Sequence, residues 1–239
     1  MTDPAHPPYA LRMNWERLCF MHWPVSADAL QAHLPPGLTL DTFHGQAYLG
    51  VVPFLMSGVA PRGLPTVTGL SAFPELNLRT YVIDTEDKAG VWFFSLDAGQ
   101  PIAVRLARLG FHLPYFDARM WSQRRGEVTE YASVRTHKGV TKGAFAAAYR
   151  PTGPAFESQE GSLEEWLTER YFLFSAAGNR MYRGPIWHRR WPLQRAEAEI
   201  RMNTLPDLIG VKLEGEPHLL YGEKQVVKAG LIGRVGNSP

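Results

Sequence analysis

Gly69-Leu-Ser-Ala-Phe-Pro-Glu-Leu-Asn-Leu-Arg-Thr-Tyr-Val82 is the stretch around which the predicted fold is built, because a loop with glycine and proline runs here into a strand-like segment. Successive side chains of a strand point to opposite faces. One face therefore carries the polar side chains of Glu75, Asn77, Arg79 and Tyr81. Neighbours on that face lie about 6.6 Å apart, so the arginine could bind a carboxylate while the acid exchanges protons. The alternative interpretation is an outward, solvated face.

Length and composition place the chain among globular proteins. Its 239 residues are 45% hydrophobic and 20% charged, and the net charge of +2 is too small to indicate a nucleic-acid partner. Cys19 is the one cysteine, which excludes an internal disulfide, and its apolar neighbours predict a core position. The first nine residues lack an apolar signal region, and no run approaches the ~18 apolar residues of a membrane span. A cytoplasmic location without a membrane partner is predicted.

The rest of the chain reads as short strands interrupted by three helices. Strands are predicted at residues 15–23, 38–43, 46–56, 75–84, 91–96, 111–121, 128–136, 143–150, 180–187, 197–202 and 218–235. Helices are predicted after the capping residues Ser26, Asp97 and Ser162, ending near residues 34, 109 and 174, and the third could give way to a strand before Gly178. Residues 57–74 are predicted to form a long loop of the kind that often lines a site. The order lacks a regular βαβα alternation and favours a mostly antiparallel α+β sheet or partly closed barrel. We expect one domain over residues 1–239, with a poorly ordered tail at 1–12.

Signatures of metal and nucleotide chemistry are missing from the sequence. The eight histidines, at positions 6, 22, 33, 44, 112, 137, 188 and 218, show no spacing typical of zinc sites. The glycines form neither a Walker A loop nor a dinucleotide-binding turn, and there is no serine-hydrolase elbow. No metal and no cofactor are therefore predicted.

A basic aromatic cluster spans residues 180–192 and allows three interpretations. Its alternating tryptophans and arginines could stack and pair with single-stranded nucleic acid, although no recognised binding motif accompanies them. A solvated turn with packing tryptophans is a second interpretation. In the third, His188 enters the same pocket as Glu75 and acts as an acid, a base or a hydrogen-bond donor.

Several motifs together resemble the bacterial YqjF-like family, in that family's order and over most of the chain. They are Trp23-Pro-Val, Leu34-Pro-Pro-Gly-Leu, Gly50-Val-Val-Pro-Phe, Phe73-Pro-Glu-Leu-Asn-Leu-Arg-Thr-Tyr-Val82, Val91-Trp-Phe-Phe-Ser-Leu-Asp97, Leu167-Thr-Glu-Arg-Tyr171 and Trp191-Pro-Leu-Gln194. That family is distantly similar to acetoacetate decarboxylase. The resemblance implies an α+β fold with a partly closed β-barrel, a buried ligand cavity and a tendency to form homo-oligomers.

The chemistry of acetoacetate decarboxylase does not carry over with the resemblance. That enzyme works through a lysine that forms a Schiff base and is activated by an adjacent cationic lysine. Its lysine pair follows a proline after a strand, and the matching place here, Pro101-Ile-Ala103, contains no lysine. The six lysines, at 88, 138, 142, 212, 224 and 228, are dispersed. A Schiff-base decarboxylase is therefore disfavoured, and the resemblance places Glu75, which follows a proline, at the acid of the parent family.

Two hypotheses from different classes follow for the function. In the first, an enzyme acts on a small carboxylate or ketone: Arg79 pairs with the carboxylate, Glu75 is the general acid or base, and Asn77 orients either one. Ligand contacts are also predicted for Tyr81, Tyr115 and His188. In the second, the same pocket binds a small molecule without turnover, and single-stranded nucleic acid is not an expected partner.

Overall fold

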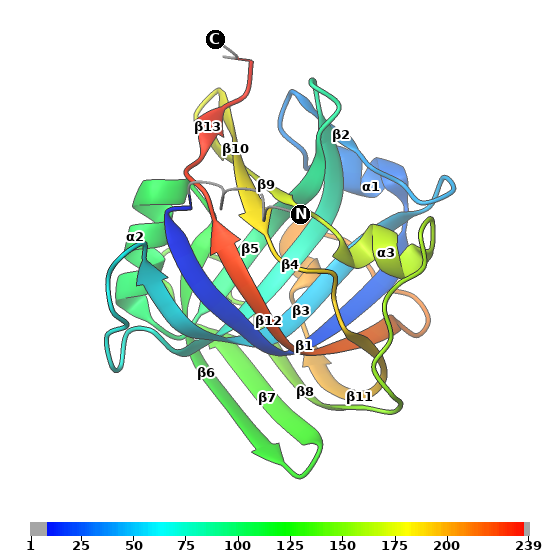
Figure 1. The fold of residues 1–239 in the computed structure, drawn as a ribbon. Coiled ribbons are helices and arrows are strands. Elements are labelled where there is room, and N and C mark those ends of the chain that lie inside the picture. Colours follow the sequence, from blue (N-terminus) through cyan, green and yellow to red (C-terminus); the bar gives the residue numbers. More distant parts are fainter. Residues whose placement is uncertain (1–8, 237–239) are drawn as a thin grey trace, which may run out of the picture.

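Residues 9–236 are described by a computed structural model in which most elements are β-strands (Figure 1). The strands are β1 (Leu11–Val25), β2 (Leu38–Leu40), β3 (Ala47–Pro61), β4 (Phe73–Asp84), β5 (Ala89–Ala98), β6 (Tyr115–Arg125), β7 (Val128–Arg135), β8 (Ala144–Pro151), β9 (Phe172–Ala177), β10 (Arg180–Trp187), β11 (Leu193–Asn203), β12 (His218–Ala229) and β13 (Gly233–Arg234). The helices are α1 (Ala27–Gln31), α2 (Pro101–Phe111), α3 (Leu163–Thr168) and the 3-10 turn η1 (Pro206–Ile209). The predicted α+β class, with a mostly antiparallel sheet and three inserted α-helices, is confirmed.

Nine strands close into a mixed barrel. They pair in the order β5-β6-β7-β8-β11-β12-β1-β3-β4, and β4 pairs with β5 to complete the ring. The pairing of β5 with β6 is parallel, and the other contacts around the ring are antiparallel. Closure joins every strand of this ring to two neighbours, which removes the exposed edges of an open sheet.

A second ring branches from the first and encloses the space next to it. One end of β5 pairs in parallel with β9 through Val91 and Trp92, while its other end pairs with β6. Strand β12 divides in the same way, because one end pairs with β11 and the other with β10. Since β9 and β10 also pair with each other, the strands β4, β5, β9, β10, β12, β1 and β3 form a closed ring of their own.

Strand β4 lies where the two rings meet, so both of its faces are buried. Leu76 and Leu78 pack on one side into the apolar core beneath β7 and β8. On the opposite side, Glu75, Asn77 and Arg79 are 2%, 6% and 9% exposed. These fractions exclude the solvated-face interpretation of the polar alternation. The strand instead presents an acid, an amide and a guanidinium to the interior of the second ring.

Several predicted element bounds were wrong, for identifiable reasons. The helix predicted up to residue 174 ends at Thr168, because the aromatic residues that follow pair as strand β9 between β5 and β10. Helix α2 is capped by Gln100, whose side chain accepts from the backbone N–H of Ile102. Asp97 instead lies in β5. Strand β12 ends at Ala229 rather than at the predicted residue 235, and it passes through Gly222, where the Trp191 ring occupies the space that a Cβ atom would need.

The ends of two other predicted segments also differ from the structure. Strand β3 continues to Pro61, so the predicted loop at 57–74 shortens to residues 62–72. Strand β1 begins at Leu11, so the predicted tail at 1–12 is too long, and its first eight residues lie outside the described part of the chain. Cys19 is fully buried, as predicted. Among the helices of residues 9–236, none has the length and apolar character required to cross a bilayer.

Candidate functional site

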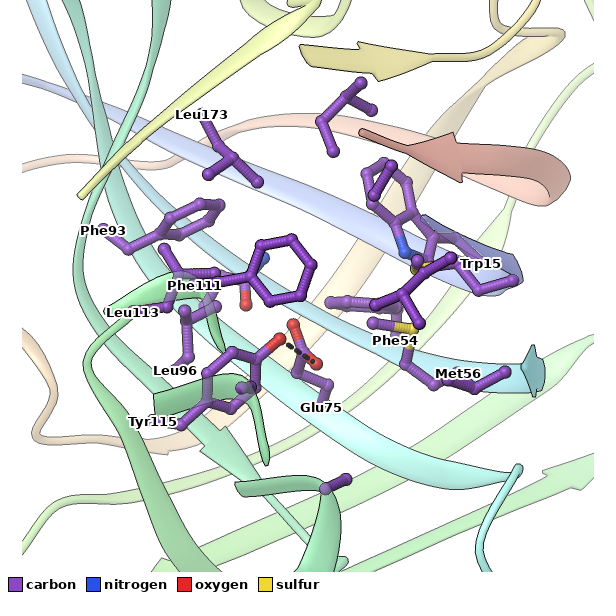
Figure 2. A pocket seen from close by; sticks show the side chains of 18 of the residues that line it. Trp15, Phe54, Met56, Glu75, Phe93, Leu96, Phe111, Leu113, Tyr115 and Leu173 are labelled. Carbon is purple, nitrogen blue, oxygen red and sulfur yellow. Dashed lines mark hydrogen bonds between the residues drawn. The ribbon is translucent and has the colours of Figure 1, made fainter. Parts of the chain in front are cut away.

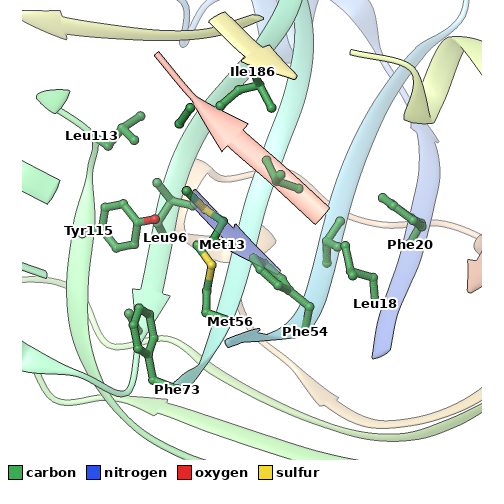
Figure 3. Packing of buried hydrophobic residues seen from close by; sticks show 14 of the residues in the cluster. Met13, Leu18, Phe20, Phe54, Met56, Phe73, Leu96, Leu113, Tyr115 and Ile186 are labelled. Atoms are coloured by element: carbon green, nitrogen blue, oxygen red, sulfur yellow. The ribbon is translucent and has the colours of Figure 1, made fainter. Parts of the chain in front are cut away.

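A cavity of about 390 Å³ fills the second ring. Its walls come from β1, β3, β4, β5, β9, β10 and β12, and α2 covers one side. Figure 3 shows the apolar wall, in which Met13, Leu18 and Phe20 of β1 lie beside Phe54 and Met56 of β3. In Figure 2 the side chains of Glu75 and Tyr115 point toward one another among such apolar residues. The polar groups of the cavity are therefore few and stand in an apolar setting.

Glu75 and Tyr115 form a buried hydrogen-bonded pair. The Tyr115 hydroxyl donates to Oε2 of Glu75 over 2.9 Å. Burial raises the pKa of Glu75 to about 8, although the hydrogen bond from Tyr115 acts in the opposite direction. Burial and the neighbouring carboxyl hold the pKa of Tyr115 well above its usual value. At pH 7 Glu75 is therefore mostly a neutral carboxylic acid, and Tyr115 remains a hydrogen-bond donor.

Arg79 is a buried cation that lacks an anionic partner. Its Nη2 donates to the Tyr81 hydroxyl at 3.2 Å and to the Leu167 carbonyl at 3.4 Å, while its Nε has no hydrogen-bond partner. Within residues 9–236, no carboxylate lies within 4.0 Å of its guanidinium. A buried charge without a counterion is destabilising. Because Arg79 lines the cavity, a bound anion could supply the missing partner.

Asn77 lies between the acid and the arginine on β4 and also lines the cavity. Its Oδ1 is buried and has no hydrogen-bond partner among the described residues. Buried polar atoms are nearly always paired in folded proteins. The unpaired amide oxygen is therefore available to a donor group of a bound molecule.

Tyr81 was predicted to contact a ligand, but it lies behind Arg79 and does not line the cavity. Its hydroxyl donates to the Leu167 carbonyl at 2.8 Å and lies 2.6 Å from Nε2 of His22. Burial and the charge of Arg79 lower the pKa of His22 well below its usual value, so this histidine is neutral. Tyr81 thus accepts a hydrogen bond from Arg79 and is itself paired with the neutral His22, so neither residue adds a charge beside the guanidinium.

Gly50 makes room for this arrangement on the neighbouring strand β3. A Cβ atom at this position would lie 3.0 Å from the His22 ring and 3.3 Å from Cγ of Arg79. Sequence reasoning missed both Gly50 and His22. The signal for Gly50 was its pairing opposite Arg79, which becomes visible only when the register of β3 and β4 is known.

A second arginine of the cavity, Arg170, was also missed. Its Nη1 lies 2.6 Å from Oδ2 of Asp41, and its guanidinium carbon lies 4.5 Å from the centre of the Trp166 ring. Nη2 of Arg170 is buried without a partner. The motif Leu167-Thr-Glu-Arg-Tyr171 contains this residue and could have identified it. Arg170 is neutralised by Asp41, so Arg79 remains the cavity arginine without a counterion in the described chain.

His188 lines the same cavity as Glu75, as the third interpretation of its cluster required. Its Nδ1 lies 2.7 Å from the Arg189 carbonyl, and its ring stacks on Tyr171 with 4.8 Å between the ring centres. Trp191 is 1% exposed. Trp191 is therefore a packing residue of the core, and His188 is the member of the cluster that lies at the cavity beside it.

The lysine pair of acetoacetate decarboxylase has no counterpart in the cavity wall. Ile102 and Ala103 of α2 line the cavity at the place where the sequence resemblance puts the pair. None of the six lysines, all within residues 9–236, lines the cavity. In the same residues no three side chains of His, Cys, Asp or Glu are grouped as metal ligands would be.

The nine-stranded mixed barrel with three helices places the chain among proteins with the acetoacetate decarboxylase-like fold. One similar structure is the enduracididine biosynthesis enzyme MppR complexed with pyruvate (TM-score 0.66, 10% identity, 99% of this chain and 94% of that chain). Another is acetoacetate decarboxylase from Legionella pneumophila (TM-score 0.60, 13% identity, 98% and 94% coverage). The chain belongs to the DUF2071 family, described as an uncharacterized conserved protein, whose model matches residues 12–226. The protein YqjF of Bacillus subtilis (strain 168) is 46% identical over 220 residues, which are 92% of this chain and 90% of that protein.

Proposed function

We propose that the cavity binds an oxo acid and that Glu75 transfers a proton at the carbon next to the ligand's carbonyl group. The guanidinium of Arg79, which has no carboxylate partner among residues 9–236 and whose Nε is unpaired there, carries this proposal, because its planar fork matches the geometry of a carboxylate. Glu75 lies on the same face of β4, so a ligand held by Arg79 would extend toward it. The fold is shared with MppR, which was solved with pyruvate, and this likeness supports the choice of ligand class.

The proposed step moves one proton and no other group. In its ionised form, Glu75 takes a proton from the carbon next to the carbonyl, and the electron pair of that C–H bond moves to the carbonyl oxygen as an enolate forms. Asn77 orients the ligand, and Tyr115 donates to the carboxyl of Glu75 throughout. A base whose pKa lies near 8 removes protons from carbon more readily than an ordinary carboxylate does. When a proton returns to the same carbon of the enolate, the step completes a hydrogen exchange. When it returns to another carbon, the step shifts the ligand's double bond.

A second candidate is a protein that binds the acid without turnover. The observation in its favour is the raised pKa of Glu75, which leaves little of the basic form at pH 7. The same neutral carboxylic acid can donate a hydrogen bond to the carbonyl of a ligand. Binding and exchange must therefore be measured separately.

Exchange of hydrogen for deuterium tests the proposed step. We expect the protein to exchange protons of pyruvate, whose carbonyl adjoins the carboxylate, or of levulinate, whose carbonyl lies two methylenes away, as followed by NMR in deuterated water. The rate should rise with the ionised fraction of Glu75 between pH 7 and 9. Glu75→Gln should reduce the rate roughly 10²- to 10⁴-fold, the usual contribution of a positioned acid or base. Glu214→Gln, at an exposed position away from the cavity, is the control.

The outcome of this experiment separates the two candidates. If calorimetry shows that either acid binds while neither exchanges above the rate in buffer, the binding protein is the correct description. If neither acid binds, the assignment of Arg79 as a carboxylate site is wrong.

Borohydride should fail to trap a ketone on this protein. A Schiff base requires a lysine amine at the ligand, and none of the lysines lines the cavity. We expect the mass of the intact protein to be unchanged after incubation with pyruvate or acetoacetate and sodium borohydride. Stoichiometric addition of the ligand's mass would show that a lysine reaches the ligand and would contradict the proposed mechanism.

A further inference from the structure

We propose that the cavity takes an acid with an apolar tail, whose chain runs from Arg79 toward an opening between α2 and the loop at residues 62–72. This inference rests on the proposed function, because it keeps Arg79 as the site of the carboxylate. It adds the class of ligand: an aliphatic or oxo acid of medium length, which would fill more of the cavity than pyruvate does.

The size and lining of the cavity exceed what a small oxo acid needs. A volume of about 390 Å³ falls within the ~300–1,000 Å³ of pockets that enclose drug-sized ligands. Apart from the polar groups already described and the hydroxyl-bearing Ser71 and Thr168, the wall is made of aliphatic and aromatic side chains, most of them from β1, β3, β5 and α2. An apolar wall of this kind recognises hydrocarbon, since each buried methylene group contributes to binding.

Arg79 and the opening beside α2 lie toward different ends of the cavity along β4. Arg79 lies six residues from Phe73, which corresponds to ~20 Å of extended strand. The Phe73 end of β4 adjoins α2, because the backbone N–H of Gly99 donates to the Pro74 carbonyl just before the helix begins. A ligand with its carboxylate at Arg79 would therefore pass Glu75 and direct its tail toward α2.

The opening itself is lined by apolar side chains that also reach the solvent. Ile102 and Leu106 of α2 are 52% and 68% exposed, and both line the cavity. Across from them, Val67 of the 62–72 loop is 53% exposed and lines it as well. The Gln100 side chain donates to the Gly69 carbonyl over 2.7 Å and holds the helix beside the loop. Apolar residues at the rim of an apolar cavity fit a hydrocarbon tail that enters between these two segments.

A series of straight-chain acids tests the inference by calorimetry. From butyrate through hexanoate to octanoate, we expect the affinity to rise about 4-fold for each added methylene, the equivalent of ~0.8 kcal/mol for each buried CH₂ group. The α-oxo analogues of the same lengths should follow the same slope. An affinity that stays flat or falls beyond butyrate would overturn the inference.

Two variants of α2 locate the tail. Leu106→Asp places a charge at the opening and should weaken the binding of dodecanoate, whose longer chain reaches α2, at least 10-fold more than the binding of butyrate. Leu109→Asp is the matched control, because Leu109 lies on the same helix and is 77% exposed but does not line the cavity. Both positions are exposed, so neither change removes a core side chain. Equal effects of the two variants on dodecanoate would show that the tail does not pass α2.

The inference and the proposed function can fail separately. If octanoate binds with the expected slope while no oxo acid exchanges its protons, the tail site stands and the proposed catalysis is wrong. If pyruvate or levulinate exchanges while the straight-chain series is flat, the catalysis stands and the tail site is wrong. If Arg79→Met leaves octanoate affinity unchanged, the orientation proposed here is wrong.

Discussion

Replacing Arg79 with methionine is expected to weaken the binding of pyruvate, levulinate and octanoate roughly 30- to 1,000-fold. The loss follows from removing one partner of a buried charge pair, which costs about 2–4 kcal/mol. The free protein should respond in the opposite direction. Its buried guanidinium has no anionic partner in residues 9–236, so an apolar side chain of similar length should leave the free energy of unfolding unchanged or raise it.

Calorimetry and thermal unfolding of the same samples check both parts of this prediction. Arg119→Met is the control, because Arg119 is exposed on β6, and it should change neither affinity nor stability measurably. Arg79→Lys keeps the charge but lacks the planar fork of the guanidinium. Its affinity for the acids should therefore lie between those of Arg79→Met and Arg119→Met. A marked loss of stability in Arg79→Met together with normal acid binding would mean that Arg79 is a structural residue.

Glu75→Gln should remove most of the pH dependence of stability between about pH 5 and 8. The folded-state pKa of about 8 lies above the ordinary value of 4.5, so within this window the folded chain holds a proton that the unfolded chain releases. The contribution of the neutral acid is fully present below about pH 4.5 and is lost as the pH rises to about 8. Since one pKa unit corresponds to ~1.36 kcal/mol, the contribution of Glu75 to the free energy of unfolding should fall by about 3–5 kcal/mol over the window.

Urea unfolding at intervals from pH 4.5 to 9 measures this difference. The burial of Asp97 raises its pKa to about 6 and adds a smaller slope of the same sign, so the informative quantity is the difference between wild type and variant. Tyr115→Phe removes the hydrogen bond that lowers the pKa of Glu75. In this variant the fall of the free energy of unfolding with pH should therefore persist and extend to higher pH. Parallel curves for the wild type and Glu75→Gln would show that Glu75 is ionised throughout.

The sequence predicted the fold class and much of the site because both leave local or family-wide signals. Alternation along residues 75–81 identified the polar face, and the motifs shared with the YqjF-like family indicated a barrel. Tyr115 and His188 were named from outside this stretch, and the structure places both in the cavity with Glu75. Their roles remain predictions, to be tested by the variants and pH profiles above.

Other features could not be derived from the sequence because they depend on contacts between distant segments. The aromatic run after Thr168 fits helical spacing, yet it becomes strand β9 because β5 and β10 offer it hydrogen-bonding partners. Arg170 joins the cavity only because Asp41, more than a hundred residues away, neutralises it. Tyr81 shares the polar face of β4 but is directed away from the cavity, toward His22 and the Leu167 carbonyl.

By itself, the sequence determined which side chains of the 69–82 stretch share a face and that no lysine stands at Pro101-Ile-Ala103, because alternation and residue identity are properties of the chain. Only the tertiary structure decided that this face is buried and that Arg79 has no carboxylate partner among residues 9–236. Burial depends on the ring that β9, β10 and β12 close from the far end of the chain, and ion pairing depends on which side chains that closure brings together. The same closure turns a polar strand face into one wall of a cavity, where an unpaired guanidinium and a neutral acid can act on a ligand.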